Sequence, residues 1–509
     1  MLIVKKTFYV LVVSGLMRMS LLLMAQLPYW YDELIFISFS KQPLVQLLDT
    51  LSSEPHPPGF FLLLKLLPVE NVLVTRLLML GISYALFGIG VMYAYKTRLI
   101  ERAKLTWGLT LFFTSYSFYS ATMYVRDRST SIPLAFIGLM IALNMLDAPK
   151  KYARVKHVAG LGIIGVLLLF LSYDIFLFYL LAIILLTLYI RNRSLIILNG
   201  CIGIVGLLYS AMYGIGQIGG NAGRSIWFSY VYNSLWHAFY KHVAGVLPFQ
   251  FMTDAAVGIY SILMGYAMFK WREVNRSVGI GVGAFLILSI GIAYATNLFS
   301  RAHYVALLFL PVCIIAGWGM EYIKRAQMKY VLVTIVAIVG FGAYLFDYMR
   351  ARQLYTILPD TIAKELVHRP EKQYGLIADA PLMPFVIKMG YFSDEDNVRP
   401  MQIVSDDVLE TDEITRYHLQ TDTALDWTKL TKDMIRSRLN RYGHEHIIYY
   451  YSPFTQTYQT DIAHTLLRIL ITSCTEHAPV PISEHQLIFI FHGCTFTDTI
   501  RSFEAGESL

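Results

Sequence analysis

The stretch from residue 29 to residue 61, YWYDELIFISFSKQPLVQLLDTLSSEPHPPGFF, decides how the rest of the chain is interpreted. It follows an apolar segment and begins with two adjacent acids, Asp32 and Glu33. It returns to apolar sequence through Glu54, His56 and two prolines. Ionisable groups at membrane depth are rare and usually functional. The stretch therefore predicts a polar loop with a function at a membrane surface.

The composition is that of a polytopic membrane protein. Hydrophobic residues make up 56% of the 509 residues, charged residues only 15%, and the mean hydropathy is +0.51. The net charge of +7 comes from short basic clusters between apolar segments, which is typical of cytoplasmic loops and does not indicate a nucleic-acid partner. No small-residue cleavage site precedes Tyr29, so the N-terminal segment is interpreted as a retained first helix.

The basic clusters also predict the topology. Clusters such as those at 96–104 and 150–156 are expected in the cytoplasm, with roughly 20 residues for each crossing. The segment 59–68 is too short to cross and is expected to lie along the outer surface. About eleven spans follow, with the N-terminus inside: 8–28, 74–95, 105–123, 130–147, 158–172, 175–190, 195–213, 248–269, 277–297, 303–321 and 330–348.

Polar residues become dominant from about Arg350. Short apolar segments at 374–378, 446–451 and 486–491 predict buried strands, and 462–473 predicts a helix. We therefore expect an all-α polytopic membrane domain at 1–349 and a small extracytoplasmic α/β domain at 350–509. Cys474 and Cys494 both fall in the second domain, where an oxidising compartment would permit a disulfide, although the sequence leaves their pairing open.

The predicted topology gathers polar groups on the outer face. Carboxylates beside arginines at a bilayer surface suit a reaction on an anionic lipid headgroup. Arginine binds phosphate through a planar fork, and a fixed carboxylate can take a proton from a hydroxyl. The candidates are Asp32, Glu33, Glu54, His56, Tyr124, Arg126, Asp127, Arg128, Tyr173, Asp174, Arg301, His303 and Tyr304, with Arg224, His237, Lys241 and His242 in the long loop 214–247.

Several motifs resemble the GT-C glycosyltransferases. They are the Asp-Glu pair after the first helix, the HPP motif at 56–58 and the arginine in VTRLLMLGISYALFG at 74–88. YSATMYVRDRSTSIPLAF at 119–136 is similar to a Tyr/Arg-containing outer turn of the protein-mannosyltransferase and aminoarabinose-transferase-like branch. SRAHYVALLFLP at 300–311 resembles its late Arg-bearing helix start. The resemblance covers most of residues 1–350. It departs at Asp174, where relatives often carry a histidine, which leaves open a metal or a second acid.

This resemblance implies an inverting glycosyltransferase of the cytoplasmic (inner) membrane. It would move one sugar from a polyprenyl-phosphate donor to a lipid, polysaccharide or protein acceptor. Asp32 matches the catalytic general base, with Glu33 beside it as a second catalytic candidate. The substrate-binding candidates are Arg126, Arg128 and Arg301 for the lipid phosphate and Glu54, His56, Tyr124, Asp174, His303 and Tyr304 around them. No cofactor is required by the resemblance, and a divalent cation is left open.

Structural interpretations compete with each of these roles. Asp32 and Asp174 are also suitable helix caps, and His56 a turn residue. Arg76, Arg301 and the charges at 126–128 also suit the ends of helices, while Arg18 lies within the first apolar helix and is expected to face the bundle interior. A ligase or polymerase that moves a whole lipid-linked glycan and a non-enzymatic lipid or solute transporter are the alternative functions. Charges gathered at one surface, and not at the midplane, favour an enzyme.

Overall fold

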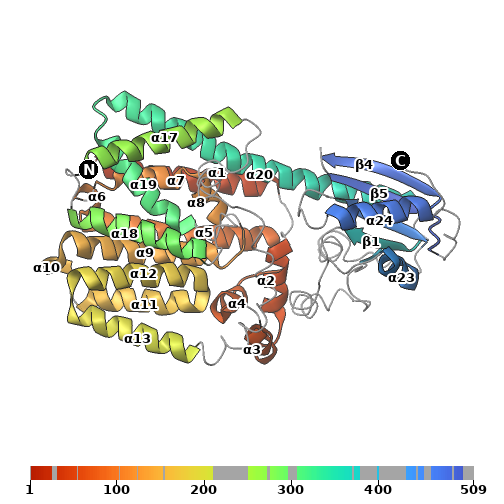
Figure 1. Cartoon of the computed structure of the whole chain (residues 1–509), viewed down its shortest axis with the longest axis horizontal. Coiled ribbons are helices and arrows are strands. Elements are labelled where there is room, and N and C mark those ends of the chain that lie inside the picture. Colours follow the sequence, from red (N-terminus) through yellow and green to blue (C-terminus); the bar gives the residue numbers. More distant parts are fainter. Residues whose placement is uncertain are drawn as a thin grey trace. The chain divides into compact units, whose positions relative to one another are not determined.

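The computed structural model describes two compact units (Figure 1). The first comprises Met1–Leu27 and Phe36–Met349, and the second comprises Pro28–Ile35 and Arg350–Leu509. The residues that the structure describes are 2–25, 31–53, 56–102, 104–122, 124–152, 155–209, 250–271, 276–295, 306–368, 372–378, 398–400, 432–442, 445–451, 460–483 and 486–496.

The first unit is a bundle of apolar helices, as expected where lipid offers the backbone no hydrogen bonds. Among the described residues, seven helices are long and apolar enough to cross a membrane. They are α1 (Leu2–Ala25), α5 (Val72–Lys96), α9 (Arg128–Asp147), α12 (Tyr173–Ile190), α17 (Gln250–Phe269), α18 (Arg276–Ala295) and α20 (Ala326–His368). Shorter apolar helices are α11 (Val155–Leu171), α13 (Arg193–Tyr209) and α19 (Ala306–Glu321).

The predicted spans coincide with helical sequence where they are described, but the span 105–123 is not one helix. It is divided into α7 (Thr106–Phe113) and α8 (Tyr116–Ala121). The Thr114 hydroxyl donates to the carbonyl of Thr110, 3.0 Å away, and Ser115 caps α8 by accepting from the backbone N–H of Phe118 at 3.2 Å. Such side-chain bonds to the backbone compete with helix continuation, and the sequence prediction missed this break.

α9 is the centre of the bundle and packs against α5, α11, α12 and α18 (Figure 1). Elsewhere small residues allow helices to approach closely, as is typical of membrane bundles. A β-carbon on Gly317 of α19 would collide with the backbone of Gly108 in α7.

Short helices connect or precede the long ones: α2 (Tyr31–Lys41), α3 (Leu44–Ser53), α4 (Pro58–Leu64), α6 (Leu99–Arg102) and α10 (Pro149–Tyr152). α4 has seven residues and is too short to span, as predicted for this part of the chain. Its buried Phe60 and Phe61 pack with Phe36 of α2, with ring centroids 5.5 and 5.3 Å apart.

The second unit contains a five-stranded mixed sheet with the order β2-β1-β3-β5-β4. β1 is parallel to β2 and β3, and β5 is antiparallel to β3 and β4. Apolar residues of α23 and α24 pack on strand residues such as Ile447 and Phe491. The elements are β1 (Tyr374–Ala378), β2 (Val398–Pro400), α23 (Lys432–Tyr442), β3 (His446–Tyr451), α24 (Thr460–Ser473), β4 (Glu476–Ser483) and β5 (Gln486–His492).

Three strands and one helix of this unit lie where the sequence predicts them, whereas β2, β4 and α23 were not predicted. β4 contains Pro479 and Pro481, which argue against a strand in sequence; the structure places it at the edge of the sheet, where proline is tolerated. Cys474 and Cys494 are joined by a disulfide, which answers the question that the sequence left open. The loop 214–247, with the predicted outer-face residues Arg224, His237, Lys241 and His242, lies outside the described residues.

Candidate functional site

Residues 124–128, here called the outer turn, connect α8 to α9 and are held by neighbouring helices. The Ser83 hydroxyl of α5 donates to the carbonyl of Ser129 at 2.6 Å, just beyond the turn. Within the turn, the N–H of Arg126 donates to the carbonyl of Tyr124 at 2.9 Å. The charged residues predicted at 126–128 therefore belong to a fixed part of the backbone.

A buried ionic cluster forms where the N-terminal ends of α9 and α12 meet. Arg128 Nε and Nη2 donate to Asp174 Oδ2, at 3.2 and 3.0 Å, and Arg128 Nη1 lies 3.5 Å from Asp127 Oδ1. The Ser172 hydroxyl lies 2.6 Å from both Asp127 Oδ2 and Asp174 Oδ1. We call Asp127, Arg128, Ser172 and Asp174 the ionic cluster.

The charge and burial of the ionic cluster show what it can do. Asp127 and Arg128 are 3% and 5% exposed, and Ser172 is fully buried. Two carboxylates face one guanidinium, and the serine hydroxyl has a single hydrogen that it can donate to only one carboxylate at a time. Arg128 is therefore the group that keeps the buried Asp127 and the half-buried Asp174 together, because buried charges require pairing.

Asp174 lies in the first turn of α12, where a carboxylate is favoured by the helix dipole. Asp174 is not the N-cap of α12, because Ser172 occupies that position; its side chain instead pairs with Arg128 from α9. This pairing spans 46 positions of sequence, and no local spacing indicates it.

Arg126 differs from Arg128 in being half-exposed. Its guanidinium lies over the ring of Tyr124, 5.8 Å from the ring centroid, in the range of a cation–π contact. Arg126 and Tyr124, both predicted substrate-binding residues, therefore lie together in the outer turn.

The helix that follows the HPP motif, α4, lies against the last turn of α11. A β-carbon added to Gly59 would be 2.5 Å from the carbonyl oxygen of Phe170, two residues before Ser172. His56 is half-buried and packs edge-on against Phe36, with ring centroids 5.0 Å apart. The motif and the ionic cluster are thus brought to the same end of the bundle.

Asp32 and Glu33 belong to the second compact unit. α2 begins at Tyr31, so Asp32 lies in the first turn and does not precede the helix as an N-cap would. The Asp32 side chain is outside the described part of the structure, while Glu33 is fully buried. Glu54, Arg301, His303 and Tyr304 lie outside the described residues.

Arg18 is a buried cation whose partner was not predicted. Its Nη2 donates to the carbonyl of Thr122 at 2.5 Å, and its Nη1 to the Thr122 hydroxyl. The guanidinium also lies over the rings of Tyr84 and Tyr344, 5.9 and 5.2 Å from their centroids. Arg18 therefore ties α1 to the end of α8, directly before the outer turn.

The described residues provide no cluster of three or more His, Cys, Asp or Glu side chains that suits a metal ion. In the ionic cluster both carboxylates pair with the Arg128 guanidinium. The divalent cation that the sequence left open thus gains no set of ligands from this part of the chain.

No family model matches the chain, and no curated protein matches its sequence. Its structure is similar to the crystal structure of ArnT from Cupriavidus metallidurans bound to undecaprenyl phosphate, with 12% sequence identity and a TM-score of 0.46; the match covers 96% of this chain and 97% of that chain. It is also similar to arabinofuranosyltransferase AftD from Mycobacteria, with 14% identity and a TM-score of 0.43, covering 96% of this chain and 40% of that chain.

Proposed function

We propose that the chain is a membrane glycosyltransferase of the GT-C type. It transfers one sugar from a polyprenyl-phosphate donor to an acceptor on the outer face of the cytoplasmic membrane. The ionic cluster carries this proposal, because it holds buried charges at the N-terminal ends of two membrane helices and not at the midplane, where transporters bind their substrates.

The orientation is supported by the opposite ends of the same two helices. α9 is followed by Lys150 and Lys151, and α12 by Arg191 and Arg193. Basic loops favour the cytoplasmic side, and this supports an ionic cluster at the outer surface. In this orientation we expect residues 350–509 to form an extracytoplasmic domain.

In the proposed reaction Asp32 is the general base. Its carboxylate accepts the proton of an acceptor hydroxyl while that oxygen attacks the anomeric carbon of the sugar. The bond from the anomeric carbon to the phosphate oxygen breaks, and polyprenyl phosphate leaves with the electron pair. Direct displacement from the opposite face inverts the anomeric configuration. Glu33 is proposed to support Asp32.

Two arginines of the outer turn have different proposed roles. Arg128 is paired with Asp174 and Asp127, so we assign it to holding the turn in place. Arg126 is less buried than Arg128, and we assign it, with Arg301, to the phosphate on which negative charge develops in the transition state. Tyr124, His56, Glu54, His303 and Tyr304 are proposed to surround the sugar and the acceptor.

The test compares glycans of cells that carry the wild type, Asp32→Asn, Arg126→Ala or the matched control Asp49→Asn, an exposed acid of α3. Protein levels in the membrane are matched, and the masses of surface glycolipids, polysaccharides and glycoproteins are measured. Loss of a single-sugar increment in the first two variants, with the control unchanged, is the expected result and identifies the acceptor.

Two other outcomes contradict the proposal. Loss of a whole oligosaccharide in Asp32→Asn would indicate a ligase that moves lipid-linked glycans. An unchanged glycan mass profile in Asp32→Asn would exclude Asp32 as the general base and would favour a transporter.

A further inference from the structure

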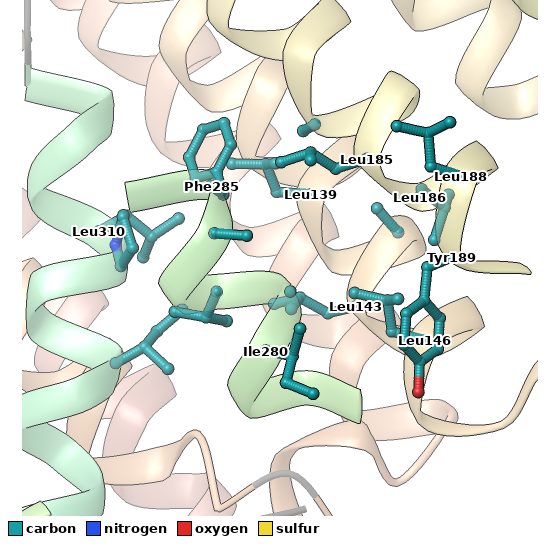
Figure 2. Close-up of a pocket in the computed structure, with 17 residues that line it drawn as sticks. Leu139, Leu143, Leu146, Leu185, Leu186, Leu188, Tyr189, Ile280, Phe285 and Leu310 are labelled. Carbon is teal, nitrogen blue, oxygen red and sulfur yellow. The ribbon is translucent and has the colours of Figure 1, made fainter. Parts of the chain in front are cut away.

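An apolar cavity of about 290 Å³ lies between α9, α12, α18 and α19 (Figure 2). Leu143, Leu146, Tyr189, Ile280, Phe285 and Leu310 are among the residues that line it. Tyr189 is the one lining residue with a polar side-chain atom, and Figure 2 shows its hydroxyl at the edge of the group. The cavity therefore suits a hydrocarbon chain.

The depth of the cavity separates it from the ionic cluster. Leu143 follows Arg128 by 15 positions in α9, and a helix rises about 1.5 Å per residue, so the two lie about 22 Å apart along the axis. The hydrocarbon core of a bilayer is about 30 Å thick. The cavity thus belongs to the leaflet on the basic side of the bundle, which is the cytoplasmic leaflet in the orientation proposed above.

Polar and basic groups lie where the cavity approaches the membrane surface. The hydroxyl of Tyr189, in the last turn of α12, lies 2.6 Å from the hydroxyl of Ser277 in the first turn of α18. The exposed Arg191 caps α12, and the exposed Arg276 is the first residue of α18. Within the described residues neither arginine has an ion pair.

Arg276 is also poorly placed for its own helix. A cation at a helix N-terminus is opposed by the helix dipole, whereas an anion there is stabilised by both the dipole and the arginine. Basic pockets between membrane helices on the cytoplasmic side recognise anionic lipid headgroups. The exposed charges beside the cavity therefore favour an anion next to a hydrocarbon chain.

We propose that this cavity and the two arginines bind one anionic phospholipid of the basic-side leaflet. One acyl chain occupies the cavity, and the headgroup phosphate lies at Arg191 and Arg276, with Tyr189 and Ser277 between them. The acyl chains of the bilayer are as apolar as the cavity wall, so burial of the chain alone does not favour binding. The cavity therefore contributes a fit to the shape of one chain, and the arginines favour an anionic headgroup. This site is separate from the proposed donor phosphate, which lies at the opposite end of the bundle.

Native mass spectrometry of the purified full-length chain tests the site, after incubation with equal amounts of phosphatidylglycerol and phosphatidylcholine. Ala284→Phe fills the cavity from a half-buried lining position of α18. Ile287→Phe is the matched control, because Ile287 is on the same helix, is 71% exposed and does not line the cavity. We expect the wild type and the control to retain one phosphatidylglycerol, and Ala284→Phe to lose it.

The arginines are tested by Arg191→Gln and Arg276→Gln. Each is expected to reduce the preference for phosphatidylglycerol over phosphatidylcholine about fivefold, the contribution of one basic residue near a membrane surface. Equal retention by the wild type and Ala284→Phe would overturn the proposal. An unchanged lipid preference in the arginine variants, or polyprenyl phosphate bound in place of phospholipid, would overturn it as well.

Discussion

Arg128 is the residue on which the ionic cluster depends, since its one positive charge pairs with two carboxylates, the buried Asp127 and the half-buried Asp174. Asp174→Asn leaves Arg128 beside Asp127, whereas Arg128→Met leaves Asp127 and Asp174 facing each other across Ser172. Removing one partner of a buried pair costs about 3–5 kcal/mol. We expect Arg128→Met to lower the free energy of unfolding by about this amount, and Asp174→Asn by less.

Unfolding of the purified chain in lipid nanodiscs measures both changes. The exposed Arg193 provides the control Arg193→Met, which should leave the stability unchanged. A larger loss in Asp174→Asn than in Arg128→Met would contradict this charge balance.

A second prediction concerns the effect of replacing Arg18 on the stability of the helix bundle. The two terminal nitrogens of Arg18 both bind Thr122, and its flat guanidinium lies over two tyrosine rings. A lysine ammonium cannot reproduce this forked, stacked arrangement. A hydrogen bond to a charged group contributes about 1.5–3 kcal/mol, so we expect Arg18→Lys to destabilise the bundle by about that amount. The same unfolding measurement applies, with Arg193→Lys as the control; equal stability of the two variants would contradict a role for the guanidinium fork.

The sequence predicted Asp127, Arg128 and Asp174 of the ionic cluster, but neither Ser172 nor the pairing of these residues. Basic loops were sufficient to place Arg128 and Asp174 on one face, because the positive-inside rule acts on whole loops. That they form an ion pair depends on how α9 packs against α12, which no local pattern specifies. For Arg18 the cost of a membrane charge predicted an inward direction, whereas its partner, Thr122, is an uncharged residue that a search for carboxylates does not find.

Elements were predictable where a single physical signal dominates. Hydropathy located the membrane helices, because about 20 apolar residues are needed for each crossing. It did not reveal the break between α7 and α8, which depends on two hydroxyl groups bonding to the backbone, at Thr114 and Ser115. It also did not reveal β4, where the prolines become acceptable only because the strand lies at the sheet edge.

A further prediction concerns the close contact between Gly59 of α4 and Phe170 of α11. A β-carbon there would lie 2.5 Å from a backbone oxygen, that of Phe170, which no side-chain rotation can relieve. Overpacking of this kind costs about 1–3 kcal/mol, and here it would push the HPP motif away from the end of α11. We expect Gly59→Ala to lower both stability and glycan transfer.

Gly81 of α5 is the matched control for Gly59→Ala, because a β-carbon at Gly81 meets nothing within 4 Å. Gly81→Ala should be neutral or stabilising by up to about 1 kcal/mol, the helix propensity difference. If the two alanine variants behave alike in unfolding and in glycan mass, the contact between Gly59 and Phe170 does not position the motif.

For the whole molecule, the state of the cysteines tests which side of the membrane the second unit occupies. Disulfides persist in oxidising compartments and are rare in the cytosol. The chain has four cysteines, of which Cys201 and Cys313 are free and Cys474 is bonded to Cys494. If residues 350–509 are extracytoplasmic, denatured protein taken directly from cells should be alkylated at two cysteines before reduction and at all four after it. Mass spectrometry counts the additions, and Cys474→Ser is the control that should release Cys494 without reductant. Four additions before reduction would place the second unit in a reducing compartment, and the proposed orientation of the membrane helices would then be reversed with it.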